Sequence, residues 1–139
     1  MKKYVLIACC KTKRKEPGKF KACELYISDL FKKSMAYAKS LSPDKIFILS
    51  AKYHLLELDK EIETYNEKLS DKPANERKIW AETVIKKLSE TTDLQNDEFI
   101  FLAGNDYIKD LEHKIKFPKK PLKGKRSGER KKWLKENTP

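Results

Sequence analysis

The 139-residue sequence lacks the features that would assign a function most directly. No apolar run approaches the roughly 18–20 residues needed to cross a bilayer, so we expect no membrane span. Neither GxGxxG nor GxxxxGK[ST] occurs, so the glycine-rich loops that bind dinucleotides or nucleoside triphosphates are not predicted. There is no internal repeat and no low-complexity linker, and the length is typical of a single domain, residues 1–139.

Cysteine and histidine are also scarce, with three and two residues respectively. They show no CxxC motif and no zinc-ligand spacing, so we expect no metal and, with the nucleotide loops missing, no cofactor. An odd set of cysteines predicts a reducing, cytoplasmic location. The chain starts with the pattern of a lipoprotein signal, but its apolar stretch, 4–8, is shorter than the roughly 7–15 residues required, and a buried strand explains it better.

Positive charge is in excess and unevenly distributed. The net charge is +11, to which residues 1–23 contribute +7 and residues 113–139 contribute +9, whereas residues 24–112 contribute −5. Two basic ends would form a binding surface for a polyanion, such as nucleic acid or a nucleotide-like anion, if they meet on one face. The alternative is a solvated lysine-rich surface without a partner.

Apolar patterning predicts the fold class. Three runs, residues 4–8, 45–49 and 98–102, are typical of strands covered on both faces. Because helical segments separate them, we expect an α/β domain, a small three-layer Rossmann-like sandwich whose mainly parallel sheet has three or four strands. Residues 9–23 are expected to form a basic loop, and residues 50–74 a long connection that packs back on the body.

Apolar residues at three- and four-residue steps predict the helices. One spans residues 24–41, and a second runs from an N-cap at Asn75 to about Glu90. The second helix is expected to bury Ile79, Trp80, Val84, Ile85 and Leu88. A third helix, capped by Asn105 or Asp106, carries Tyr107, Ile108, Leu111 and Ile115. A closing helix over residues 128–136 points Trp133 and Leu134 inward, so the basic segment 117–139 is expected to dock on the domain.

Ligands of open parallel sheets bind where the strands end. Three segments that are distant in sequence, residues 9–11, 50–54 and 103–106, directly follow the predicted strands. We therefore expect them to lie together and to form one site. Cys9 is either a nucleophile, because neighbouring lysines favour its thiolate, or a small apolar residue at a strand end. Ser50 and Lys52 are candidates for a nucleophile–base dyad, or they contact one ligand. His54 is a candidate acid or base, or a structural histidine.

Candidate anion-binding groups surround these residues. Lys11 and Lys13 follow the first strand and bind phosphate or merely solvate a loop. Gly104 follows the third strand, where a glycine lets a ligand approach backbone N–H groups, although a tight turn would also require it. Arg126 and Arg130 reach phosphates if the C-terminal segment folds over the crevice, and otherwise belong to a solvated tail.

An ordered series of short motifs covers nearly the whole chain and resembles a widespread uncharacterised bacterial, archaeal and phage domain family. The motifs are Ala8-Cys9 with Lys13, Leu25-Tyr26-x-Ser28-x-Leu30-Phe31, Leu49-Ser50-Ala51-Lys52-Tyr53-x-Leu55, Tyr65, Trp80, Leu102-Ala103-Gly104-x-x-Tyr107, and Pro121-Leu122-x-Gly124-x-x-x-Gly128 with Trp133-Leu134. The block from Leu49 to Tyr65 is also similar to a segment of the YaaA peroxide-stress family and of the lysine-transfer domain of archaeosine synthases.

The resemblance implies a nucleic-acid or nucleobase setting, since YaaA proteins are linked to DNA binding and archaeosine synthases act on a transfer-RNA base. It adds to the substrate-binding candidates the motif residues Tyr26, Ser28, Tyr53, Tyr65, Tyr107 and Gly128. His54 stands where these families usually have glycine. A left-handed backbone there would be tolerated by histidine at a modest cost.

Three functions therefore remain open. The first is an enzyme that acts on a nucleobase or nucleotide, as a base-modifying transferase or glycosidic-bond lyase, with Tyr53 or Tyr65 stacked on the base. In it Lys52 or His54 is the acid or base, and Lys13, Gly104 and Arg126 hold phosphate. The second is a non-catalytic DNA- or RNA-binding stress-response module, and the third is a small-metabolite enzyme. The sequence carries no signal for an oligomeric state.

Overall fold

The computed structural model describes residues 1–9 and 13–139 and has a five-stranded main sheet. Its strands are β1 (Lys3–Ala8), β3 (Lys45–Ser50), β4 (His54–Glu57), β6 (Glu98–Leu102) and β7 (Phe117–Lys119). They are ordered β4-β3-β1-β6-β7, and only β4 runs antiparallel to its neighbour. The predicted α/β fold with a mainly parallel sheet is confirmed, with five strands where three or four were expected.

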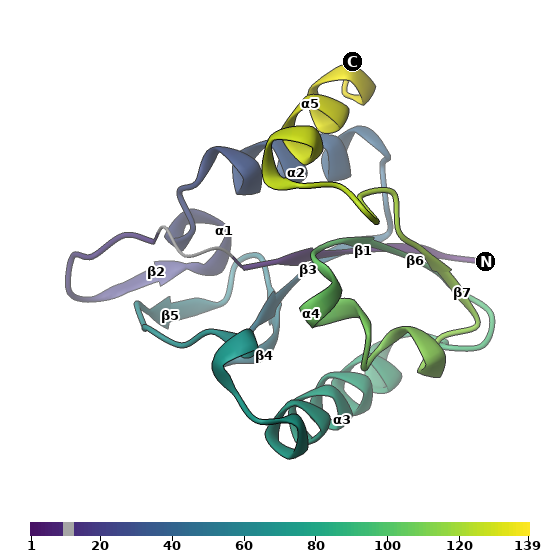
Figure 1. Cartoon of the computed structure of the whole chain (residues 1–139), viewed down its shortest axis with the longest axis horizontal. Helices are drawn as coiled ribbons and strands as arrows, with labels where there is room; N and C mark the ends of the chain where they lie inside the picture. The colour runs from purple at the N-terminus through teal and green to yellow at the C-terminus, as the bar shows by residue number, and fades with distance from the viewer. Residues whose placement is uncertain (10–12) are drawn as a thin grey trace.

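The helices form a layer on each side of this sheet, as Figure 1 shows. One side carries α2 (Asp29–Ser40) and α5 (Ser127–Asn137), which pack against each other. The other side carries α3 (Ala74–Thr91) and the short α4 (Asn105–Ile108). No helix in the described part of the chain is long and apolar enough to cross a membrane.

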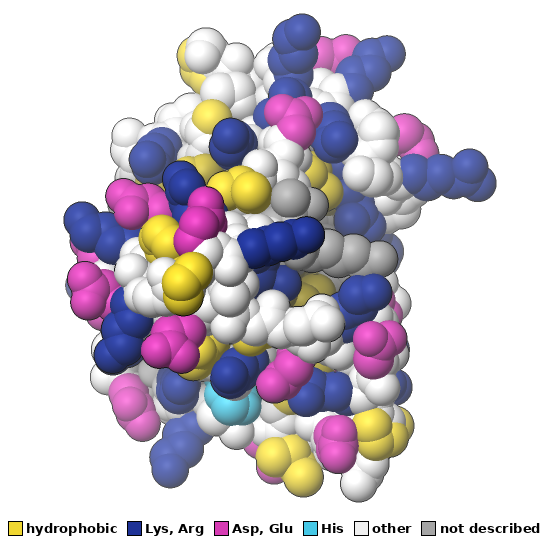
Figure 2. Space-filling model, turned by 90° about the vertical axis from the view of Figure 1, so that its left-hand side faces the viewer, with side chains coloured by type: hydrophobic (Ala, Val, Ile, Leu, Met, Phe, Trp, Pro, Cys, Tyr) yellow, Lys and Arg dark blue, Asp and Glu magenta, His cyan; other side chains and the backbone are white. Residues whose placement is uncertain are grey.

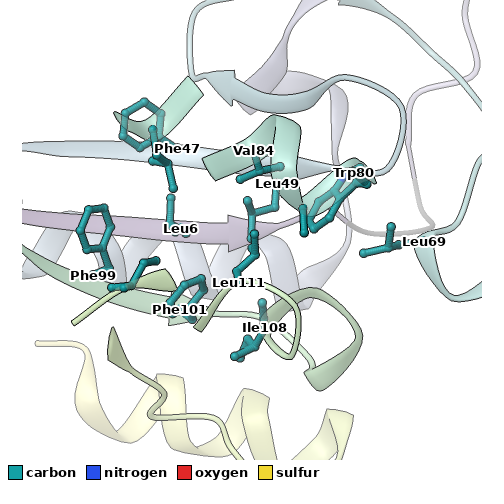
Figure 3. Close-up of a cluster of buried hydrophobic side chains, with 14 of the residues drawn as sticks. Leu6, Phe47, Leu49, Leu69, Trp80, Val84, Phe99, Phe101, Ile108 and Leu111 are labelled. Carbon is teal, nitrogen blue, oxygen red and sulfur yellow. The ribbon is translucent and has the colours of Figure 1, made fainter. Parts of the chain in front are cut away.

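Alternate residues of the central strands are buried on opposite faces, which explains their continuous apolar runs. Figure 3 shows the core on the α3 side, where Leu6, Phe47 and Phe101 of the sheet meet Trp80 and Val84 of α3. On the opposite face, the next residues along each strand pack against α2 and α5, where Leu134 is fully buried. The strand ends are therefore held rigidly between two packed layers.

The helix predicted over residues 24–41 is wrong, because two helices occupy this segment. The first, α1, spans Ala22–Leu25, and α2 begins only at Asp29. Ser28 is extended and its Oγ accepts a hydrogen bond from the backbone N–H of Phe31 at 3.1 Å, so it caps α2. Tyr26 lies in the break between them and forms an isolated β-bridge with Lys13.

Two further helix predictions need correction. The N-cap of α3 is Pro73 rather than Asn75, and Ile79 is 60% exposed because it lies next to the buried stripe of Trp80, Val84 and Leu88. The helix predicted to continue to Ile115 stops at the end of α4, and a 3₁₀ turn, Glu112–Lys114, follows.

A second, small sheet covers the end of the domain beside α1. Its antiparallel strands are β2 (Lys19–Lys21) and β5 (Glu61–Glu63). They arise from segments 9–23 and 50–74, which the sequence analysis assigned to a loop and a connection. Ile62 is buried while the glutamates on both sides are exposed. The predicted packing of segment 50–74 against the body is therefore present, as a short strand pair.

Candidate active site

The three predicted patches begin at one edge of the sheet. Strands β1, β3 and β6 are parallel, so Cys9, Ser50 and Gly104 lie at the ends of neighbouring strands (Figure 1). The backbone N–H of Cys9 donates to the carbonyl of Leu49 at 2.9 Å, which fixes the thiol-bearing residue beside β3. Figure 2 looks onto this edge and shows basic and acidic side chains interspersed over it.

Ser50 is at the centre of a buried hydrogen-bond network. Its side chain is fully buried, and Oγ donates to the hydroxyl of Tyr65 at 2.8 Å while accepting from the backbone N–H groups of Lys52 and Tyr53. The Tyr65 hydroxyl in turn lies 2.6 Å from that of Tyr26. These bonds occupy the Ser50 hydroxyl, so it ties the turn after β3 to the tyrosines rather than facing a cavity.

A second pair of polar groups joins β1 to α4. The thiol of Cys9 lies 3.0 Å from the hydroxyl of Tyr107. Burial, followed by the negative charge that Cys9 can carry, raises the pKa of Tyr107, and the same two causes raise the pKa of Tyr65. Both phenols are therefore protonated at neutral pH, and each can donate a hydrogen bond. The Tyr107 ring is fixed by an edge contact with Trp80, whose indole N–H donates to the Ser50 carbonyl.

Two adjoining cavities open beside Cys9. The smaller, about 290 Å³, is lined by Ala8, Cys9, Leu30, Phe31, Ser34, Leu102, Ala103, Gly104, Asn105, Asp106, Tyr107, Leu122 and Arg130. The larger, about 610 Å³, is lined by Cys9, Lys13, Leu30, Asn66, Glu67, Lys68, Leu69, Ser70, Asp106, Tyr107 and Arg130. The two cavities share the lining residues Cys9, Leu30, Asp106, Tyr107 and Arg130, so they adjoin one another.

Cationic side chains reach these cavities from two directions. Arg130 extends from α5 to Gly104, where a Cβ would lie 3.4 Å from its Nη2, and its Nε donates to the carbonyl of Lys125. Lys13 lies over the Tyr65 ring, with Nζ 4.6 Å from the centroid. Gly104 has an ordinary φ of −80°, so its backbone conformation does not require glycine, and the space above it is taken by Arg130.

The other predicted site residues lie outside the two cavities. Lys52 is exposed, with Nζ 5.4 Å from the Tyr53 ring centroid, and Tyr53 in turn packs edge-on against Tyr65. Arg126 and Gly128 are exposed at the start of α5. Ser28 caps α2, as described above, and Lys11 lies outside the described residues.

His54 lies on β4, which is separated by β3 from the strand that leads into Cys9. It pairs with Ser50 as the first residue of β4, with a left-handed φ of 66°. Burial, with the charge of Lys87 adding to it, lowers the pKa of His54. Its charged surroundings therefore come from α3 and from Lys72 and Glu67, and its catalytic role stays a prediction.

Sequence reasoning missed Ser34, which lines the smaller cavity. It lies on the buried stripe of α2 together with Phe31, Met35 and Ala38. A hydroxyl in an otherwise apolar stripe is the signal that could have identified it. In the described part of the chain, no group of three or more His, Cys, Asp or Glu residues is placed to hold a metal ion.

Comparison with known proteins adds the family but no activity. No curated protein and no solved structure matches the chain. The model of DUF6884, a family of unknown function, matches residues 4–136, from the start of β1 into the last turn of α5. All the residues that line the two cavities fall within this range. The chain therefore belongs to the DUF6884 family.

Proposed function

We propose that the chain is a thiol-dependent enzyme that acts on a nucleobase or nucleotide at the carboxyl edge of the sheet. The observation that carries this proposal is the position of Cys9. Cys9 lines both cavities, its thiol lies 3.0 Å from the Tyr107 hydroxyl, and Arg130 lines the same two cavities. A nucleophile, a hydrogen-bond donor and an anion-binding group thus converge on one space.

The reaction that fits this set is transfer or cleavage at a glycosidic bond. The Cys9 sulfur attacks the anomeric carbon, the carbon–sulfur bond forms and the bond to the base nitrogen breaks. The thiol proton passes to the departing base, directly or through the Tyr107 hydroxyl. Water or a second base then displaces the sulfur and returns a proton to it. Tyr107 is protonated at neutral pH, so its hydroxyl can donate a hydrogen bond to the Cys9 thiolate or to the departing base.

Two further observations support a nucleotide as the substrate class. Lys13 and Arg130 line the cavities and provide positive charge for a phosphate. The similarity of the block from Leu49 to Tyr65 to the YaaA family and to archaeosine synthases supports the same nucleic-acid setting. In this proposal Ser50 and Tyr65 hold the turn after β3, and the substrate meets Cys9 and Tyr107.

Release of free base tests the proposal. The purified chain is incubated with ribo- and deoxyribonucleoside 5′-monophosphates and with single-stranded and duplex oligonucleotides, and free base is measured by chromatography. Intact-protein mass spectrometry detects a pentosyl adduct. Cys9→Ser should abolish both signals, and Tyr107→Phe should slow release about 10- to 100-fold. Cys23→Ser is the matched control, because Cys23 lies outside both cavities, and it should behave like the wild type.

The enzymatic proposal fails if the wild type releases no base from any of these compounds. The role of Cys9 fails if Cys9→Ser is as active as Cys23→Ser.

A non-catalytic nucleic-acid-binding module is the second candidate, favoured by the charge of residues 113–139, which is net +9. Affinity for an oligonucleotide, measured by fluorescence anisotropy between about 50 and 200 mM salt, separates the two. A module predicts a steep fall of affinity with salt and no effect of Cys9→Ser on any measured property.

A further inference from the structure

A buried serine borders the smaller cavity. Ser34 is 3% exposed and lines this cavity. It lies on the inward stripe of α2, where the neighbouring positions are apolar. A serine hydroxyl at the wall of a cavity can donate one hydrogen bond to a ligand oxygen and accept others.

Arg130 supplies a positive charge to the same cavity. Its Nε is held by the Lys125 carbonyl at 2.9 Å, which fixes the side chain and leaves the two terminal nitrogens for a ligand. Among the described residues, no carboxylate lies within 4.0 Å of its guanidinium; Asp106, which borders the cavity, is paired at that limiting distance with Lys109. A guanidinium fork matches the oxygens of a phosphate and can bind two of them at once.

The packing of α2 against α5 brings these two groups to one cavity. The two helices meet through an edge contact of Tyr37 with Trp133, whose ring centroids are 5.0 Å apart, and through the fully buried Leu134. The hydroxyl and the guanidinium thus belong to one rigid helical layer. Both line the cavity that contains Cys9 and Tyr107.

We propose that Ser34 and Arg130 form a subsite for the phosphate monoester of the substrate, placing the sugar beside Cys9 and the base in the larger cavity. The inference rests on the proposed function and specifies its substrate as a nucleotide rather than a nucleoside. The smaller cavity, at about 290 Å³, has about half the volume of the larger one, so we assign the phosphate end of the ligand to it. The larger cavity, at about 610 Å³, accommodates the remainder.

The test compares matched ligands by isothermal titration calorimetry on the full chain. The ligands are the common ribonucleoside 5′-monophosphates, their parent nucleosides and inorganic phosphate. At least one 5′-monophosphate should bind at least about tenfold more tightly than its nucleoside, and inorganic phosphate should compete with it. Arg130→Gln should remove most of this preference, and Ser34→Ala should reduce it about threefold to tenfold.

Controls separate loss of the subsite from loss of structure. Lys135→Gln removes an exposed charge from the same helix and should leave the preference unchanged. The melting temperature of Ser34→Ala is measured as well. It should stay close to that of the wild type, because alanine suits a helix and only one oxygen is removed, so weaker binding in this variant is not caused by unfolding. The inference is overturned if nucleoside and 5′-monophosphate bind equally, if neither binds at about 10 mM, or if Arg130→Gln retains the preference.

The subsite and the chemistry are tested independently. Cys9→Ser should still prefer the 5′-monophosphate to its nucleoside, because we assign this preference to Ser34 and Arg130. If it does so while the wild type releases no base, the reaction is wrong and the subsite stands. If base is released with no preference for the phosphate, the subsite is wrong and the reaction stands.

Discussion

The two edges of the main sheet use polar side chains in different ways. At the amino edge, Asp44 accepts the backbone N–H of Lys3 at 2.7 Å, and Asp97 accepts those of Lys2 and Asp93. At the carboxyl edge, hydroxyl and thiol groups bond to one another, and Cys9 and Tyr107 also face cavities. Carboxylates thus anchor the main chain where strands begin, and weakly acidic groups gather where strands end. We expect the amino edge to govern stability and the carboxyl edge to govern chemistry.

Removal of the buried carboxylate of the amino edge should have the largest effect on folding. Asp97 is 7% exposed and accepts two backbone hydrogen bonds, so Asp97→Ala should lower the free energy of unfolding by about 3 kcal/mol. Asp44, which is exposed and accepts one, provides the comparison, and Asp44→Ala should cost about 1 kcal/mol. Urea denaturation measures both. Equal losses, or reduced base release by folded Asp97→Ala, would contradict the division between the edges.

Two phenylalanine variants distinguish structural from catalytic tyrosines within the carboxyl edge. Tyr65→Phe removes a hydroxyl bonded to both Tyr26 and Ser50, and should lower the free energy of unfolding by about 2 kcal/mol. Tyr107→Phe loses one bond, to the Cys9 thiol, and should cost about 1 kcal/mol or less. The order should reverse in turnover, since Tyr107 lines the cavities and Tyr65 does not. Urea denaturation together with base-release assays decides this, and a larger turnover defect in Tyr65→Phe would refute the assignment.

Among the residues that the structure describes, each edge also contains one non-glycine residue with a left-handed backbone. Ser42, before β3, has φ 48°, and His54, after it, has φ 66°. Ser42→Gly should raise the free energy of unfolding by about 0.5 kcal/mol, because relief of strain slightly exceeds the entropic cost of glycine. His54→Gly should gain less, since it also loses the contacts of a half-buried ring. Thermal melting compares the two, and a clearly larger gain at His54 would show that its ring contributes nothing to packing.

The smallest expected effect is the pH dependence contributed by His54. Burial and then the charge of Lys87 lower its pKa, so the unfolded chain takes up the proton at a higher pH than the folded one. The stabilisation is fully present above the ordinary histidine pKa of about 6.5 and is lost as the pH falls through the lowered value. His54→Asn, which suits a left-handed backbone, should therefore lose less stability than the wild type between about pH 7 and 5. A steeper loss in the variant would mean that the shift has the opposite sign.

The sequence predicted the parts of the fold whose pattern is set by burial on both faces. The strands β1, β3 and β6 are continuous apolar runs, and they matched the structure to within one residue. The sequence analysis did not predict the edge strands β4 and β7, because they are short and only partly buried. In addition, β7 contains Pro118, which is unfavourable inside a strand. The break at Tyr26 was missed because the apolar stripe continues across it.

The prediction of the site shows a similar division. Cys9 and Gly104 followed from the rule that parallel strands end together, and the structure places both beside the smaller cavity. Lys52 and His54 were chosen because they are near Ser50 in sequence. His54 does pair with Ser50, but it does so on the side of β3 away from β1, and neither residue lines the two cavities. Ser34 acquires its position only when α5 docks on α2, and no local pattern carries that information.

The dependence of the smaller cavity on α5 has a consequence for the order of synthesis. Cys9 and the strands that position it are translated well before α5. A nascent chain interrupted before Arg130 would present the Cys9 thiol without the guanidinium that we assign to substrate recognition. Translation of α5 therefore completes the pocket, because only then do sulfur and cation become neighbours.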